Sequence, residues 1–293
     1  MPARIAILGA GALGQLYAGL LAQAGLNPLL LTRPGTQAKA QCHQLQWLDG
    51  SVSNLALEHH PSDQAIGNID ALWVLTKATN VDTALLPILQ WLPTAVPIVL
   101  LHNGMGPQQR LPKRYPNHHW WAGSVTDGAE RLGPYGVAQR GVGQRLVGHL
   151  QPLTQQPPRS LPPGCQALGF RYSDEIAAVL WRKLTVNAIL NPICTRERIC
   201  NGELIHFADE VNALATELAA LAKTLGFADR PAQISQRVLE VANRTAGNRC
   251  STLQDVEAGR PTEMAAILGF VLETAKRQRL SLPLFETLYQ PYR

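Results

Sequence analysis

The chain has 293 residues, of which 46% are hydrophobic, and a formal net charge of +5. This length exceeds the usual size of one hydrophobic core, so we expect two domains, each with enough apolar residues to form a core. There is no run of about 18 uncharged apolar residues and no signal-peptide pattern, so we expect a cytoplasmic protein without a membrane partner. The basic residues form no run typical of nucleic-acid binding, and their excess lies in the first 169 residues, where a small polyanion is the expected partner.

Short apolar runs alternate with helical patterns through the first hundred residues. Strands are predicted at 4–9, 29–32, 71–76 and 97–101, with helices near 12–24 and 81–91. Uninterrupted apolar strands joined by helices are typical of a parallel, doubly wound sheet. Residues 119–149, rich in Gly, Val and Thr, are predicted to add antiparallel strands to that sheet.

The pattern changes after a proline-rich segment, residues 151–164, which we interpret as a surface loop. Helices are then predicted at about 174–199, 203–225, 231–246 and 261–279. The predicted fold class is therefore α/β, with an N-terminal Rossmann-type sheet domain (residues 1–169) followed by an all-α domain (residues 170–293). We expect a cleft between the two domains.

The segment GAGALG ends the first predicted strand and begins the first predicted helix. In this context a GxGxxG pattern indicates a dinucleotide site, because the glycines allow a tight turn, close approach of a pyrophosphate and close helix packing. A glycine turn with a purely structural role is the alternative. The candidate cofactor residues here are Gly9, Ala10, Gly11, Ala12, Leu13 and Gly14.

Three further candidates follow the ends of predicted strands, where ligands bind in such sheets. Arg33 stands where an NAD-binding protein normally has an acidic residue, and a guanidinium pairs with a 2′-phosphate, so NADP(H) is favoured over NAD(H). Lys77 can supply a second cation to the cofactor, and Asn103 a hydrogen bond to ribose, nicotinamide or a substrate carbonyl. The alternatives are a solvated arginine, a surface lysine and an ordinary Asn-Gly turn.

In the first helix of the second domain, Lys183, Asn187 and Asn191 recur every fourth position and so share one face. Two asparagines have poor helix propensity and gain nothing in water, so this stripe is predicted to line a cleft; a solvated face is the alternative. Pro192 is predicted to end or kink the helix directly after Asn191.

The five cysteines are scattered and form no CxxC pair, so neither a disulfide framework nor a structural zinc site is expected. The adjacent pairs His59–His60 and His118–His119 point to opposite faces of a strand. No metal is therefore assigned.

The ordered motifs resemble the ketopantoate reductase family (2-dehydropantoate 2-reductase) over nearly the whole chain. In sequence order they are GxGxxG at 9–14, Arg33, "TK" with Lys77, "HNGMG" with Asn103, "WRKLxxNxxxNP" at 181–192, "NGEL" with Asn201, "NxxSxLQD" with Asn248 and Ser251, and Glu263. The resemblance implies reduction of 2-dehydropantoate to (R)-pantoate by NADPH, in the pathway to pantothenate and coenzyme A.

The same resemblance implies a role for each matched residue, with Lys183 as the proton donor. It implies substrate binding by Lys183, Asn187, Asn191, Asn201, Asn248, Ser251 and, by its position, Asn103. It implies cofactor contacts for Lys77, Asn103, Ala129 and Glu263. An ammonium group suits the reaction because hydride transfer to a ketone builds negative charge on its oxygen. Without the resemblance, Ser251 with Gln254 fits a helix capping box, and Glu263 after Pro261 fits the first turn of a helix.

Several positions depart from the family pattern. Leu268 stands where relatives have Asn, Asp127 where they have His, and Cys194 and Thr195 also differ. These differences leave open an NADPH-dependent reductase of another small 2-oxo acid. A non-catalytic dinucleotide-sensing protein is a separate alternative, which needs the glycine loop but not Lys183 or the asparagines. The chain is expected to be a monomer or a homodimer, and the sequence favours neither.

Overall fold

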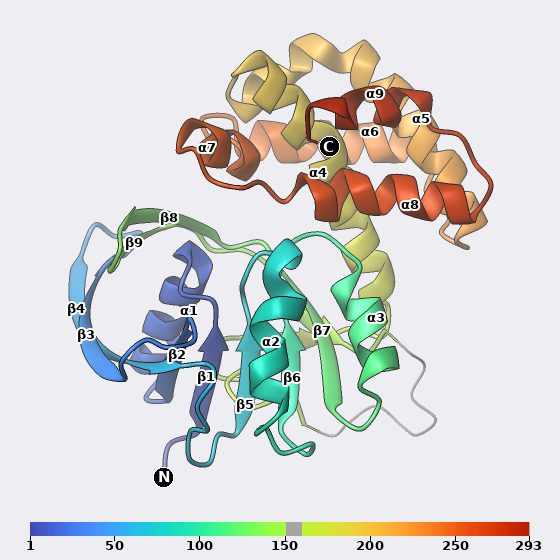
Figure 1. Ribbon diagram of the computed structural model, residues 1–293. Helices are drawn as coiled ribbons and strands as arrows, with labels where there is room; N and C mark the ends of the chain where they lie inside the picture. Colours follow the sequence, from blue (N-terminus) through green and yellow to red (C-terminus); the bar gives the residue numbers. More distant parts are fainter. Residues whose placement is uncertain (151–159, 293) are drawn as a thin grey trace. The chain divides into compact units, whose positions relative to one another are not determined.

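The computed structural model describes residues 1–150 and 160–292, and its N-terminal part is built on an eleven-stranded sheet (Figure 1). The strand order is β11-β10-β7-β6-β5-β1-β2-β4-β3-β9-β8. The strands are β1 (Arg4–Leu8), β2 (Asn27–Thr32), β3 (Lys39–Gln46), β4 (Val52–Pro61), β5 (Ala71–Val74), β6 (Pro97–Leu100), β7 (His119–Val125), β8 (Gly128–Gly133), β9 (Gly136–Gly141), β10 (Arg145–Gly148) and β11 (Arg171–Tyr172). At its centre β6, β5, β1 and β2 are parallel, which confirms the predicted doubly wound core.

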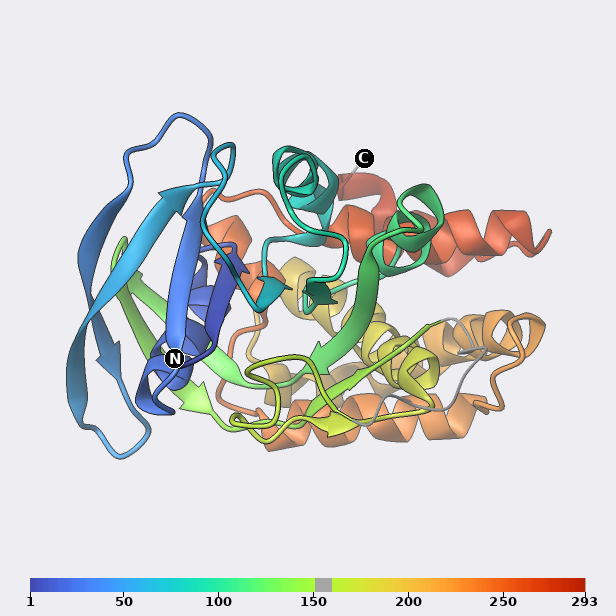
Figure 2. The same cartoon turned by 90° about the horizontal axis from the view of Figure 1, so that it is seen from below.

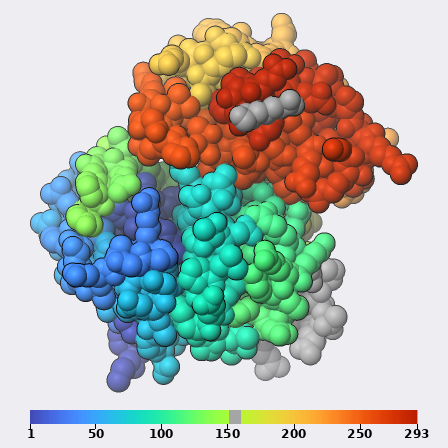
Figure 3. Space-filling view, in the orientation of Figure 1, coloured from blue at the N-terminus to red at the C-terminus, as the bar shows by residue number. Residues whose placement is uncertain are grey.

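Helices cover both faces of this core because its central strands are apolar throughout. Helix α1 (Ala12–Gln23) packs on one face, where Tyr17 and Leu21 meet residues of β1 and β5. Helices α2 (Val81–Leu89) and α3 (Pro107–Arg114) pack on the other face. The space-filling view shows α2 and α3 side by side over that face (Figure 3).

The sheet is larger than predicted at one end. The antiparallel pair β3 and β4 was not expected, because its polar residues alternate with half-buried ones and resemble loop sequence. Strands β8 and β9 form an antiparallel hairpin, which joins the sheet through pairing of β9 with β3 and not beside β7. β7 itself is parallel to β6 and antiparallel to β10. The added strands curl around α1 (Figure 2).

The chain forms two compact units, one of residues 1–102 and 107–177 and one of residues 103–106 and 178–293. The sheet unit thus extends to Ala177 and not to residue 169, because β11 pairs with β10. The other unit is helical. Its elements are most of α4 (Ile176–Glu197), η2 (Asn201–Phe207), α5 (Ala208–Thr224), α6 (Pro231–Arg244), α7 (Ser251–Glu257), η3 (Ala265–Gly269), α8 (Phe270–Arg277), α9 (Pro283–Tyr289) and η4 (Gln290–Tyr292).

Helix α4 continues through Pro192 to Glu197, close to the predicted helix of residues 174–199, so of the two effects predicted for Pro192, an end or a kink, the end does not occur. A proline removes one helical hydrogen bond, but Ile193 and Cys194 directly after it are fully buried, and their packing maintains the helix. The proline-rich segment predicted to be a surface loop lies, for residues 151–159, outside the described part of the chain. Within residues 1–150 and 160–292, none of the helices is both long and apolar enough to span a bilayer.

Candidate active site

The glycine-rich loop between β1 and α1 needs glycine at two of its three fingerprint positions for steric reasons. Gly9 has φ +115°, and a Cβ there would lie 2.5 Å from the backbone nitrogen of Thr76. A Cβ on Gly14 would lie 1.8 Å from the carbonyl oxygen of Gly9. Both distances are well below van der Waals contact, so the loop adopts this path only with glycine at these positions.

Gly11 is different, because a Cβ there would meet no atom of the described chain within 4 Å. Gly11 is exposed and is the N-cap residue of α1, and no described side chain caps this helix end. The first backbone N–H groups of α1 therefore point toward open space at the positive end of the helix dipole. This arrangement fits a bound pyrophosphate.

Arg33 lies directly after β2 in a turn stabilised by threonines. Its carbonyl oxygen accepts hydrogen bonds from the Thr36 hydroxyl, at 2.8 Å, and from the Thr36 backbone N–H. The Arg33 side chain is exposed. The turn therefore fixes the backbone of Arg33 and leaves its side chain accessible to an anionic ligand.

Lys77 and Ala129 lie in separate parts of the sheet unit. Lys77 is half-buried at the N-cap of η1 (Ala78–Asn80), three residues after the end of β5. The residue before it, Thr76, is the one whose backbone nitrogen a Cβ on Gly9 would meet. Ala129, near the start of β8, packs with Ala12 of α1 against a small apolar cluster. The structure thus brings Ala129 close to the first turn of α1.

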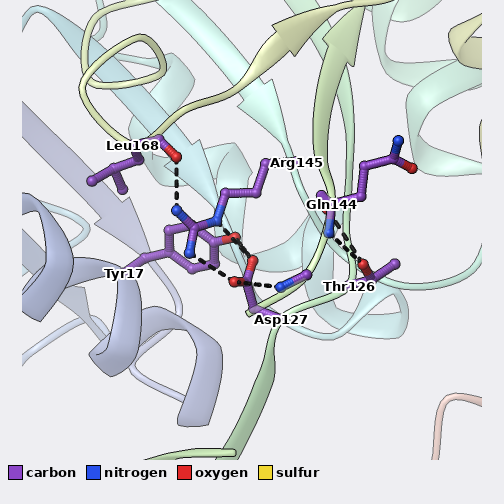
Figure 4. A network of polar contacts seen from close by, with 7 residues as sticks. Tyr17, Thr126, Asp127, Gln144, Arg145 and Leu168 are labelled. Atoms are coloured by element: carbon purple, nitrogen blue, oxygen red, sulfur yellow. Dashed lines mark hydrogen bonds and ion pairs between the residues drawn. The ribbon is translucent and has the colours of Figure 1, made fainter. Parts of the chain in front are cut away.

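Asp127, which stands where the resemblance implies histidine, is the centre of a buried polar network (Figure 4). Arg145 donates two hydrogen bonds to its carboxylate, at 2.7 and 2.9 Å, and the Tyr17 hydroxyl donates a third, at 2.5 Å. Burial alone would raise the pKa of Asp127, but the hydrogen bonds from Arg145 and Tyr17 outweigh burial and lower it. Arg145 also donates to the Leu168 carbonyl oxygen. Asp127 thus joins α1, β10 and the segment around Leu168, and these contacts occupy both of its oxygens.

Asn103 and Glu263 are brought together within the helical unit, although 160 residues separate them. The Asn103 side-chain amide donates to a carboxylate oxygen of Glu263 at 3.1 Å, and Glu263 is 9% exposed. The turn that follows Asn103 packs closely against Ala266 of η3. Gly104 in this turn has φ +73°, and a Cβ there would lie 2.6 Å from the Ala266 carbonyl oxygen. That same oxygen accepts a hydrogen bond from the Met105 N–H.

Glu263 does not lie in the first turn of a helix that starts at residue 261, as the sequence suggested. It comes just before the helical residues, and its carbonyl oxygen accepts the N–H groups of Ala266 and Ile267. The turns that follow, η3, form a π-helix, a conformation found mostly as single turns and often at functional sites. Leu268, where the resemblance implies Asn, is fully buried in η3.

The polar stripe of α4, formed by Lys183, Asn187 and Asn191, lies on a helix whose other residues are mostly buried. Lys183 and Asn187 are half-buried and Asn191 is 4% exposed, whereas Leu184, Val186 and Leu190 of the same turns are buried. The Asn191 carbonyl oxygen accepts a hydrogen bond from the Cys250 thiol, with an S···O distance of 3.7 Å. This bond links the end of the stripe to the start of α7.

The remaining candidates lie around the start of α7. The Asn201 N–H donates to the Asn248 carbonyl oxygen at 2.8 Å, and the Asn201 side chain donates to the Thr245 hydroxyl at 2.9 Å. Asn201 is buried, whereas Asn248 and Ser251 are exposed. The capping box expected for Ser251 is not formed, because Cys250 is the N-cap residue of α7 and its sulfur accepts the Leu253 N–H.

Sequence reasoning missed two polar groups of the sheet unit, Gln15 and the Tyr17–Arg145 partners of Asp127. Gln15 directly follows the glycine fingerprint and is fully buried. A detectable signal was present, because Gln15 is a polar residue within an otherwise apolar stretch of α1. Arg145 and Tyr17 gave no such signal, since their partner Asp127 is distant in sequence from both.

Comparisons with known proteins agree on one family. Residues 5–152 match the family described as ketopantoate reductase PanE/ApbA, and residues 175–293 match its C-terminal family. The chain is 31% identical over 296 aligned residues to a 2-dehydropantoate 2-reductase of Salmonella typhi, an alignment that covers 98% of this chain and 93% of the relative.

Solved structures are similar over nearly the full length as well. A probable 2-dehydropantoate 2-reductase from Bacillus subtilis superposes with a TM-score of 0.80 at 26% identity, covering 98% of this chain and 97% of that one. A D-mandelate dehydrogenase, solved with NADH and anilino(oxo)acetate, has a TM-score of 0.87 at 22% identity, covering 97% and 96%. The second likeness shows the shared fold.

Proposed function

The chain belongs to the ketopantoate reductase family, and from this premise we propose that it reduces 2-dehydropantoate to (R)-pantoate with NADPH. One observation carries the proposal: the two family matches follow each other along the chain, and the family's polar motif residues occur within both. The first match contains the glycine loop, and the second contains Lys183 with the asparagine stripe.

The sheet unit would bind the dinucleotide. The uncapped start of α1 and the open space beside Gly11 fit a pyrophosphate, and the exposed Arg33 would pair with a 2′-phosphate. Ala10, Ala12, Leu13, Lys77 and Ala129 would complete the contacts of this unit. When bound, the nicotinamide supplies the hydride.

The helical unit would hold and protonate the substrate. Lys183 would stabilise the negative charge that forms on the ketone oxygen and donate the proton to it. Asn187, Asn191, Asn201, Asn248 and Ser251 would orient the substrate, and orientation contributes a large part of the acceleration in such reactions. Glu263, fixed by the Asn103 amide, would contact the nicotinamide portion.

Reduction of a different small 2-oxo acid is the second candidate function. Asp127 is occupied by Arg145 and Tyr17 and Leu268 is buried, so neither offers the polar group that relatives have at these positions. A changed pocket can accept a changed substrate. A dinucleotide sensor without catalysis is the third candidate, and the presence of Lys183 and the asparagine stripe argues against it.

The proposal is tested by following NADPH absorbance with a panel of 2-oxo acids at equal concentrations. We expect the highest kcat/KM with 2-dehydropantoate and lower values with pyruvate and oxaloacetate. A higher kcat/KM for another 2-oxo acid would favour the second candidate. Binding of NADPH without turnover of any panel member would favour the sensor.

A further inference from the structure

Gln15, the residue directly after the glycine fingerprint, joins two segments that the proposed function assigns to cofactor binding. Its side-chain nitrogen donates to the Ala10 carbonyl oxygen in the glycine loop and to the Pro134 carbonyl oxygen, each at 3.2 Å. Pro134 lies in the turn between β8 and β9, the hairpin that carries Ala129. Gln15 is fully buried, so water does not compete for these bonds.

The contacts determine the orientation of the Gln15 amide. The Ala10 and Pro134 carbonyl oxygens only accept hydrogen bonds, so the NH₂ end of the amide must face them. Its oxygen then faces Nδ1 of His43, at 3.0 Å, and this nitrogen must carry the donated hydrogen. A rotated amide would lose the bonds to both carbonyl oxygens, and unsatisfied buried polar groups are costly.

His43 is held in turn by His59. Their Nε2 atoms lie 2.8 Å apart, so one nitrogen donates and the other accepts. Because Nδ1 of neutral His43 carries the hydrogen, its Nε2 accepts from His59. Both rings also pack against Tyr135 of the β8–β9 turn, with centroid distances of 5.3 and 5.8 Å. The chain of bonds therefore runs from β4 through β3 and α1 to the glycine loop.

We propose that Gln15 is a positioning residue for dinucleotide binding, and that His43 and His59 fix Gln15 in the orientation that this role requires. The inference rests on the proposed function, because it assumes that the glycine loop and the β8–β9 hairpin bind the cofactor. Gln15 holds the peptide between Gly9 and Gly11 and the hairpin of Ala129 at a fixed separation. Preorganised binding segments lose less conformational entropy when the ligand binds.

The first test compares Gln15→Met with Tyr17→Phe. Gln15→Met keeps the side-chain volume but removes its hydrogen bonds, and Tyr17→Phe removes a buried hydrogen bond from the same helix without touching the glycine loop. We expect a lower Tm in both variants. We expect the NADPH Kd, measured by calorimetric titration, to rise about tenfold in Gln15→Met only. A Gln15→Met variant with a lowered Tm and an unchanged NADPH Kd would overturn the inference.

The second test changes His43 and keeps Gln15. His43→Asn retains an N–H near the position of Nδ1, so it should preserve the bond to Gln15, whereas His43→Leu removes it. We expect an NADPH Kd close to that of the wild type for His43→Asn and a several-fold higher Kd for His43→Leu. Equal NADPH Kd values in these two variants would exclude the proposed role of His43, even if Gln15→Met does not fold.

Direct titration separates a failure of this inference from a failure of the proposed function. If the wild type bound neither NADPH nor NADH, both the proposed function and this inference would be contradicted. If the wild type bound NADPH and all Gln15 and His43 variants bound it equally well, the inference alone would fall. The KM for the 2-oxo acid at saturating NADPH should stay unchanged in every variant, because these residues lie in the sheet unit.

Discussion

The glycine loop of the sheet unit and the polar stripe of α4 are specified by the sequence in different ways. In the loop, Gly9 and Gly14 are required because any Cβ would collide with backbone atoms. In the stripe, Lys183 and Asn187 are half-buried on a helix whose packing depends on other residues, such as Leu184 and Leu190. Substitutions at Gly9 and Gly14 should therefore change folding and binding together, whereas substitutions of Lys183 and Asn187 should change chemistry alone.

The largest expected effect comes from Lys183→Ala. Loss of a general acid typically costs a factor of about 10² to 10⁴, so we expect kcat to fall by that amount. The Tm should change little, because the surrounding apolar residues of α4 stay in place. Arg182→Ala is the matched control, since Arg182 is an exposed cation of the same helix turn. A Lys183→Ala enzyme with the kcat of the wild type would remove the proton-donor assignment.

The contrast within the loop is tested by Gly14→Ala and Gly11→Ala. An alanine Cβ at position 14 would lie 1.8 Å from a backbone oxygen, so we expect a loss of about 3 kcal/mol or more in the free energy of unfolding. At position 11 the Cβ would meet no atom of the described chain within 4 Å, so stability should be retained. Gly11→Ala should still weaken NADPH binding, because its Cβ occupies space that a pyrophosphate needs. Urea unfolding and NADPH titration measure both effects; equal stability of the two variants would contradict the steric argument.

Arg33 is expected to affect cofactor choice without affecting the fold. Arg33→Ser should raise the KM for NADPH about tenfold, since a charge-assisted hydrogen bond to phosphate contributes about 1.5–3 kcal/mol. The KM for NADH should stay the same, because NADH lacks the 2′-phosphate, and the Tm should not move. Parallel assays with both cofactors provide the control. Equal increases in the KM values for NADPH and NADH would show that Arg33 does not bind the 2′-phosphate.

A gradual loss of stability is expected in mild acid, with less than about a tenfold change in the folding equilibrium over the first pH unit. Burial, with a smaller contribution from neighbouring His59, lowers the pKa of His43 to about 4 from an ordinary value near 6.5. Between these two pH values the unfolded chain binds a proton that the folded chain does not. The free energy of unfolding therefore falls as the pH drops from about 6.5 to about 4, by at most about 1.4 kcal/mol per pH unit for one group.

This stability effect is isolated by comparing the wild type with His43→Asn in urea unfolding at a series of pH values. Lys39, Tyr135 and His59 are ionisable groups near the histidine pair and are present in both proteins. The pH dependence should be weaker in His43→Asn. Parallel curves for the two proteins would contradict the assignment to His43.

Much of the fold followed from apolar periodicity. The central strands and α1 and α2 begin and end close to their predicted residues, because most of their buried side chains are apolar. β3 and β4 were missed because their stability depends on pairing with each other and on β9, which no local pattern reveals. The bounds of α4 were predicted closely, but the helix does not end at Pro192, because the packing of Ile193 and Cys194 outweighs the hydrogen bond lost there.

The candidate site was predictable where a motif is local. The glycine loop was identified from six consecutive residues, because backbone sterics restrict what can stand there. The contact between Asn103 and Glu263 was not predictable from spacing, since Asn103 was assigned from its position after a strand, Glu263 was assigned by resemblance, and their meeting depends on tertiary structure. Asp127 was noted as a departure from the family, but its ion pair with Arg145 required the structure.

The division between binding and chemistry is tested most directly by the NADPH Kd of Lys183→Ala, measured by titration in the absence of a 2-oxo acid. Since the glycine loop should bind the dinucleotide without help from the α4 stripe, we predict the same Kd as for the wild type within about twofold. A Kd about tenfold higher would show that Lys183 contributes to dinucleotide binding. That result would contradict the separation of the two regions on which the account depends.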